Sequence, residues 1–153
     1  MTWTVLFAAP TAVGFAIMFN VRRRALAPVA VLAVLGKGLQ ALLISHEANV
    51  VVATFAAALL IGTVSYTLGP ATGEASSVYG FASVIPMIPG GYVLQALQAV
   101  ESVVVARSGG VQALTPLIEA ATNGITATAI LFALAIGVTS PMLLLPATRT
   151  PED

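Results

Sequence analysis

Hydrophobic residues fill long stretches of this chain, and the charged residues fall almost entirely in the short segments between those stretches. Residues 75–100 contain no charge over 26 positions, and residues 120–148 contain none either. A helix of about 20 apolar residues is long enough to cross the hydrocarbon core of a bilayer. The pattern therefore predicts an all-α membrane protein.

The apolar stretches predict about five spans, which form a single transmembrane domain over residues 1–153. The connecting segments are short, so successive spans are expected to lie antiparallel in a compact bundle. Thr115-Pro116 is expected to begin the last span, because proline is favoured at the first helical position, and Pro141 is expected to kink or end it. The predicted spans cover about residues 4–21, 26–44, 49–69, 77–106 and 115–141.

The fourth predicted span is broken at Pro86–Gly91, where the sequence reads Pro-Met-Ile-Pro-Gly-Gly. Each proline removes a backbone donor and clashes with the preceding turn, and the glycines add backbone freedom. A break at membrane depth persists only where protein or a water-lined cavity covers the unpaired backbone groups. Broken helices hold the solute in many transporters, so this break is the first indication of function.

Composition supports the membrane assignment and excludes several kinds of function. The chain is 58% hydrophobic and 8% charged, with a mean hydropathy of +0.99, whereas soluble domains have about 25% charged residues. It has no cysteine and one histidine, which excludes thiolate chemistry and a multi-histidine metal site. Three of its six basic residues lie in one short loop, so no nucleic-acid-binding stripe is present. No hydrolase or phosphate-binding motif occurs, so no catalytic residue or cofactor is expected.

The charges around the first span predict the orientation of the chain. Arg22–Arg24 follow this span and no basic residue precedes it, so the N-terminus is expected outside and the arginine loop in the cytoplasm. Five spans then place Glu74 and the C-terminal tail in the cytoplasm. The alternative is four spans with a re-entrant fourth segment, which would place Arg149 outside.

Lys37 is the charged residue that lies deepest in a predicted span, between Gly36 and Gly38. A lysine at the bilayer centre costs about 2.5–3.5 kcal/mol on insertion scales. One interpretation is a cation that faces the transport pathway and attracts a substrate carboxylate. The other is a side chain that snorkels toward the interface near Ser45, about 12 Å along the helix axis.

The break offers a second place for a carboxylate. Backbone N–H groups at the start of the second half-helix, from Gly91 onward, are expected to be exposed to an anion, because a helix N-terminus carries about +0.5 of a charge. The alternative is a kink that only shapes the bundle. Polar residues elsewhere in the spans either face the pathway or bond to a neighbouring helix. The pathway candidates are Lys37, Asn20, Pro86, Pro89, Gly90, Gly91, Gln95 and Asn123.

Three segments of the chain together resemble the threonine/serine exporter family. They are Pro10–Val21 (PTAVGFAIMFNV), Gly36-Lys37-Gly38 and Val84–Gly91 (VIPMIPGG). Thr122-Asn123 and residues 137–141 are also in step, so the resemblance covers most of the chain. More narrowly, the chain is similar to the small-subunit type, which corresponds to the second membrane half of the fused exporters. The resemblance carries over Asn20, Pro86, Pro89 and Gly90 as motif positions only.

The resemblance implies a partner, a larger membrane subunit that carries the first half of the exporter and a hydrophilic N-terminal domain. Paired two-chain relatives are associated with export of dicarboxylates such as succinate, and fused relatives with export of threonine and serine. The hypothesis is a subunit of a bacterial inner-membrane exporter for small carboxylate-bearing metabolites, driven by the proton gradient. The alternative is a non-transporting membrane scaffold that stabilises a partner membrane protein. Membrane lipids are the other expected partner, and nucleic acid is not.

Overall fold

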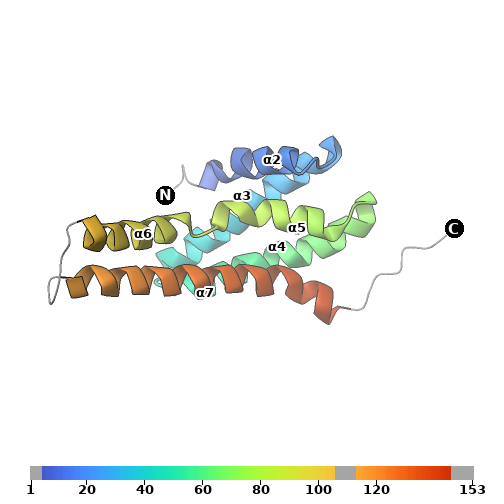
Figure 1. The fold of residues 1–153 in the computed structure, drawn as a ribbon. Helices are drawn as coiled ribbons and strands as arrows, with labels where there is room; N and C mark the ends of the chain where they lie inside the picture. The colour runs from blue at the N-terminus through green and yellow to red at the C-terminus, as the bar shows by residue number, and fades with distance from the viewer. Residues whose placement is uncertain (1–4, 106–112, 146–153) are drawn as a thin grey trace. The chain divides into compact units, whose positions relative to one another are not determined.

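The computed structural model describes residues 5–105 and 113–145, and in these residues all regular structure is helical, which confirms the predicted all-α class. The chain forms two compact units. The first unit is residues 1–87 with 133–153, and the second is residues 88–132. The helices in chain order are α2 (Ala8–Met18), α3 (Arg23–Ser45), α4 (Val50–Thr72), α5 (Ser76–Val84), η1 (Ile85–Met87), α6 (Gly90–Val105) and α7 (Leu114–Leu144) (Figure 1).

Three described helices are long and apolar enough to cross a membrane, namely α3, α4 and α7. The broken pair of α5–η1 and α6 makes a fourth if it counts as one span. The prediction of about five spans included residues 4–21, but α2 has only 11 residues. Pro10 lies in the first turn of α2, where its missing N–H costs no hydrogen bond. Asn20 takes a left-handed conformation with φ 56°, which ends the helix. Residues 1–4 lie outside the described part of the chain.

Local chemistry accounts for both ends of α4 (Val50–Thr72). Asn49 caps the start of α4, where its side-chain oxygen accepts a hydrogen bond from the Val51 N–H at 2.8 Å. Gly73 ends α4 in a left-handed conformation, φ 70°, which glycine adopts without strain. Helix α3 exceeds the predicted span 26–44 at both ends, and α4 exceeds the predicted span 49–69 at its C-terminal end, with Pro70 inside the helix.

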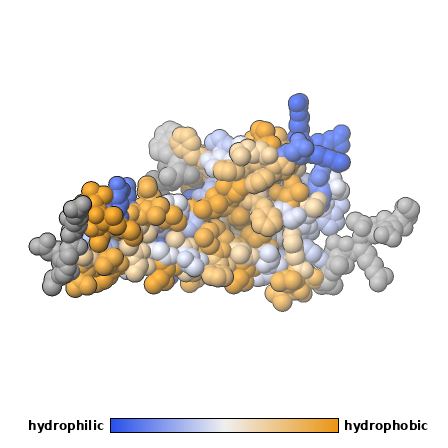
Figure 2. Space-filling model, viewed as in Figure 1, coloured by the Kyte–Doolittle hydropathy of each residue, from blue (hydrophilic) through white to orange (hydrophobic). Residues whose placement is uncertain are grey.

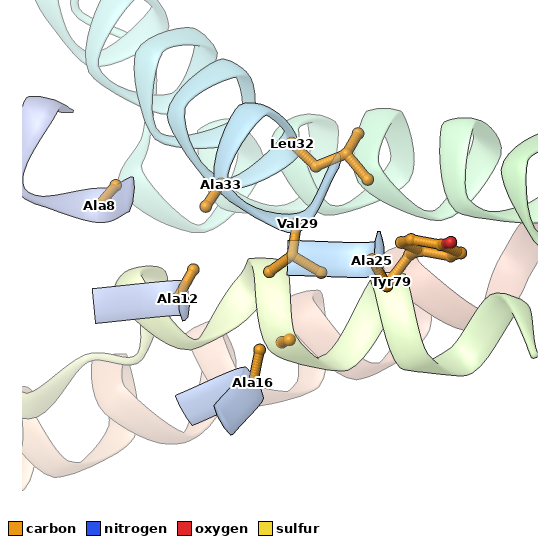
Figure 3. Close-up of a cluster of buried hydrophobic side chains, with 9 residues drawn as sticks. Ala8, Ala12, Ala16, Ala25, Val29, Leu32, Ala33 and Tyr79 are labelled. Atoms are coloured by element: carbon orange, nitrogen blue, oxygen red, sulfur yellow. The ribbon is translucent and has the colours of Figure 1, made fainter. Parts of the chain in front are cut away.

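The core of the first unit is built mainly from alanine. On α2, Ala8, Ala12 and Ala16 recur every four residues and are fully or almost fully buried. They lie on one helix face and belong to one cluster with side chains of α3 and α5, including Val29 and Tyr79 (Figure 3). Small side chains allow helices to approach closely, which favours association in lipid, where no hydrophobic effect drives helices together.

Hydroxyl groups in the helices are satisfied mostly by the chain itself. Thr63 donates to the Leu59 carbonyl at 2.8 Å and Thr139 to the Ala135 carbonyl at 2.7 Å, each one turn earlier in its own helix. These bonds pair the hydroxyl donors, which would otherwise be unsatisfied in apolar surroundings. Ser83 instead connects two helices, because its hydroxyl donates to the Val29 carbonyl at 3.2 Å. Apolar residues dominate the face seen in Figure 2, as a lipid-facing surface requires.

The predicted break in the fourth span is confirmed. The α-helix α5 ends at Val84, a short 3₁₀ turn covers Ile85–Met87, and α6 begins at Gly90. In the last helix, Pro141 lies in the final turn, since α7 ends at Leu144 and the Leu145 N–H bonds to the Pro141 carbonyl at 3.0 Å. Helix α7 contributes residues to both units.

Candidate functional site

A chain of three polar side chains crosses from α3 to α4 inside the first unit. The Lys37 ammonium donates to Gln40 Oε1 at 2.8 Å, and Gln40 Nε2 donates to Thr54 Oγ1 at 2.6 Å. The Thr54 hydroxyl donates in turn to the Val50 carbonyl at 2.7 Å. Gln40 is 4% exposed and Thr54 is 0% exposed, whereas Lys37 is half-buried. The chain of bonds therefore begins at an accessible cation and ends inside the protein.

Both ends of this chain require the same orientation of the Gln40 amide. Thr54 uses its only O–H on the Val50 carbonyl, so its oxygen can only accept from Gln40. An ammonium group only donates, so it requires the amide oxygen of Gln40 on its side. The Gln40 oxygen therefore faces Lys37, and the NH₂ group faces Thr54.

Lys37 keeps two further N–H donors after its bond to Gln40, because an ammonium group carries three. In the described part of the chain, no other hydrogen-bond partner of Lys37 is found and no carboxylate lies within 4.0 Å of its ammonium. A cation in a span normally pairs with a counter-charge or faces a polar cavity. The arrangement therefore suits the binding of an external anion.

The first part of the break lies beside this site in the first unit. A methyl group built at Gly36 would lie 3.8 Å from the Met87 sulfur and would clash with the Ile61 side chain. The η1 turn, which contains Pro86 and Met87, also packs against α3. The half-buried Pro86 thus belongs to the turn that packs beside Gly36, the residue before Lys37.

The second part of the break belongs to the second unit. After Pro89, the Gly90 N–H bonds back to the Ile88 carbonyl at 2.8 Å, and the first bond of α6 runs from the Val93 N–H to the Pro89 carbonyl at 3.2 Å. Among the described residues, the N–H groups of Gly91 and Tyr92 have no hydrogen-bond partner. A methyl group at Gly90 or at Gly91 would meet no atom of residues 5–105 or 113–145 within 4 Å.

Of the other pathway candidates, one belongs to the first unit with Lys37 and two belong to the second unit. Asn20 is exposed at the end of α2, beside the start of α3, and Lys37 lies about 21 Å further along that helix at 1.5 Å per residue. In the second unit, Gln95 is exposed on α6 and Asn123 is half-buried on α7. Within the described ranges, no cluster of His, Asp or Glu side chains suits a metal ion.

Sequence reasoning missed Gln40 and Thr54. Gln40 follows Lys37 by three residues, and residues three apart share a helix face, so this spacing was a usable signal. Thr54 lies on a different helix, and only the tertiary structure shows it beneath Gln40.

An ion pair joins two loops at the other end of the first unit. Arg22 Nη1 lies 3.3 Å from Glu74 Oε1, so the start of α3 and the end of α4 lie together. Arginines at a helix N-terminus oppose the helix dipole, so helix stability does not explain Arg22–Arg24. Basic residues after an apolar segment are instead the pattern that the orientation rule for membrane proteins associates with a cytoplasmic loop.

The comparison with known families agrees with this architecture. The family model described as "Threonine/Serine exporter, ThrE" matches residues 4–144, which is almost the whole described chain. The chain belongs to this family. This exporter is therefore a multi-pass membrane protein, and its family implies transport rather than catalysis. No solved structure matches the exporter chain.

Proposed function

We propose that this chain is the small membrane subunit of a bacterial inner-membrane exporter and moves small carboxylate-bearing metabolites out of the cell. The substrates would be threonine and serine or dicarboxylates such as succinate. Membership of the threonine/serine exporter family supports the transport class. Lys37 carries the substrate proposal, since it is a half-buried cation with spare donors and no carboxylate partner in the described chain.

Lys37 would attract the substrate carboxylate and replace part of its hydration shell. Hydrogen bonds between charged groups contribute about 1.5–3 kcal/mol each, and a partly apolar surrounding strengthens them. The free N–H groups of Gly91 and Tyr92, at the positive end of the α6 dipole, would bind a carboxylate at another point of the pathway. Asn20, Gln95 and Asn123 remain further pathway candidates in this proposal.

The proposal includes a larger partner subunit with a hydrophilic N-terminal domain and coupling to the proton gradient. Proteoliposomes that contain this chain, the partner or both chains would test the assignment. We expect export of labelled threonine or succinate only with both chains, and stimulation by an imposed proton gradient. Full export by the partner alone would instead identify this chain as a non-transporting scaffold.

Replacement of Lys37 tests its substrate role. We expect Lys37→Met to lower kcat/KM for carboxylate substrates by about tenfold to hundredfold, the effect of one lost charge-assisted hydrogen bond. Membrane abundance should stay near normal, because an apolar side chain inserts more easily than lysine. Lys37→Arg retains the charge and should retain more transport than Lys37→Met. Equal export by wild type and Lys37→Met at matched abundance would reduce Lys37 to a snorkelling residue.

A further inference from the structure

We infer that Gln40 and Thr54 are positioning residues, which hold the Lys37 ammonium where it can receive the substrate carboxylate. The inference rests on the role proposed above for Lys37. Neither residue would touch the substrate, since Gln40 is 4% exposed and Thr54 is 0% exposed. Their effect would pass through the two hydrogen bonds that connect them to the ammonium, of 2.8 and 2.6 Å.

The burial of Gln40 indicates more than helix packing. A buried amide costs free energy unless its donors and acceptor are paired, and an apolar residue of similar size would avoid this cost. The amide is paired on both sides, with a cation on one and a hydroxyl on the other. The fixed orientation of the amide makes its oxygen a permanent acceptor for Lys37.

This acceptor also fixes the position of the lysine ammonium. A free lysine side chain in a span extends toward the nearer interface, which for Lys37 is the Ser45 end of α3. The bond to Gln40 holds the ammonium beside the side chain that reaches Thr54 on α4, so the ammonium does not move freely along this direction. One of its three donors is used there, and the other two stay available for a carboxylate.

Lys37 is the only lysine in the sequence, so its ammonium can be observed directly. Labelling with [ζ-¹⁵N]lysine gives a single side-chain NMR signal from the full chain in lipid nanodiscs. We expect Thr54→Val to shift this signal, because the isosteric valine leaves the Gln40 NH₂ group unpaired and releases the amide. Thr54→Ser keeps the hydroxyl and should keep the signal in place. Thr63→Val on the same helix is the matched control, since the exposed Thr63 bonds only within its own helix.

A second variant covers the case in which Thr54→Val does not fold. Gln40→Met removes both bonds of the amide at nearly constant volume, and Thr54 still donates to the Val50 carbonyl. It should shift the lysine signal as Thr54→Val does. A signal that stays at the wild-type position in either folded variant would overturn the inference.

Transport by the two-chain exporter then separates this inference from the role proposed for Lys37. We expect Thr54→Val to raise the KM for the carboxylate substrate about threefold to tenfold with little change in kcat, and Thr54→Ser to restore the wild-type KM. In a Lys37→Met background, Thr54→Val should have no further effect, because coupled residues are not additive. If Thr54→Val shifts the NMR signal, but neither Thr54→Val nor Lys37→Met changes the KM, the substrate role of Lys37 is refuted. An equal further loss in the Lys37→Met background would show a general structural role for Thr54 and overturn the inference.

Discussion

Glycines of the first unit show how one residue type serves different purposes. A methyl group at Gly62 would lie 2.5 Å from the carbonyl oxygen of Val138, and one at Gly137 would lie 2.7 Å from the Ala58 side chain. A methyl group at Gly14 would meet no other atom within 4 Å. Gly62 and Gly137 therefore allow close contact of α4 with α7, and Gly14 does not contribute to packing among the described residues.

We expect Gly62→Ala to destabilise the folded chain by about 1–3 kcal/mol, because the added methyl group meets backbone atoms that cannot move aside. Gly14→Ala is the matched control, in which alanine adds helix propensity of up to about 1 kcal/mol without a new contact. Thermal unfolding of both variants in one detergent measures the difference. The midpoint should fall for Gly62→Ala and stay or rise for Gly14→Ala, and equal midpoints would contradict the close packing of α4 on α7.

The residues that form the Lys37 site could be predicted only in part. The cost of a charge in a span marks Lys37 from the sequence alone. The three-residue spacing from Lys37 could have identified Gln40 as its neighbour on the same helix face. No such signal identifies Thr54, because its contact depends on how α3 and α4 pack. For the same reason, the sequence alone did not distinguish the packed Gly62 from the open Gly14.

Helix boundaries in the exporter follow local signals where these are strong. The prolines and glycines of residues 86–91 predicted the break correctly, since both residue types act on the backbone of their own segment. The end of α2 at Met18 comes before the predicted end of the first span at Val21, because Asn20 takes a left-handed conformation that an apolar sequence does not show. Pro141 was expected to kink or end the last helix, and it lies in the final turn of α7, which ends at Leu144.

The break itself can be tested by replacing Pro89-Gly90 with Ala-Ala. Both helix breakers are then gone and alanine is the best helix former, so the second half-helix should extend toward η1 and its free N–H groups should find partners. Space around Gly90 allows the change, since a methyl group there meets nothing within 4 Å. We expect normal insertion but loss of most counterflow of labelled threonine and succinate in vesicles that hold both subunits.

Pro141→Ala is the control for loss of a proline from a helix, because α7 already continues through Pro141. It should transport at nearly the wild-type rate. If the Ala-Ala variant inserts normally and also transports at the wild-type rate, the break is only a bend, and the proposed binding of a carboxylate at Gly90 and Gly91 fails.

At the scale of the whole molecule, the number of spans and the orientation depend on different helices. The Arg22–Glu74 ion pair places the start of α3 and the end of α4 at one end of the first unit. If the arginine loop is cytoplasmic, the broken pair and α7 then decide the side of the C-terminus. Whether the short α2 crosses the membrane affects only the side on which the N-terminus lies. The N-terminus therefore tests α2, and the C-terminus tests the broken pair and α7.

We expect reporters fused after Arg24 and after Asp153 to lie in the cytoplasm, and a reporter at the N-terminus to lie outside. The reason for the first is the excess of basic residues after the first apolar segment. The second follows if α5–η1 and α6 together cross the membrane once and α7 crosses back.

Each position is fused in turn to alkaline phosphatase, which is active only outside the cytoplasm, and to green fluorescent protein, which fluoresces only inside it. The two reporters should therefore give opposite results at every position. A C-terminal reporter outside the cytoplasm would show that the broken pair is re-entrant. A cytoplasmic N-terminus with a cytoplasmic C-terminus would show instead that α2 does not cross, because its 11 residues span about 16 Å of a hydrocarbon core of about 30 Å.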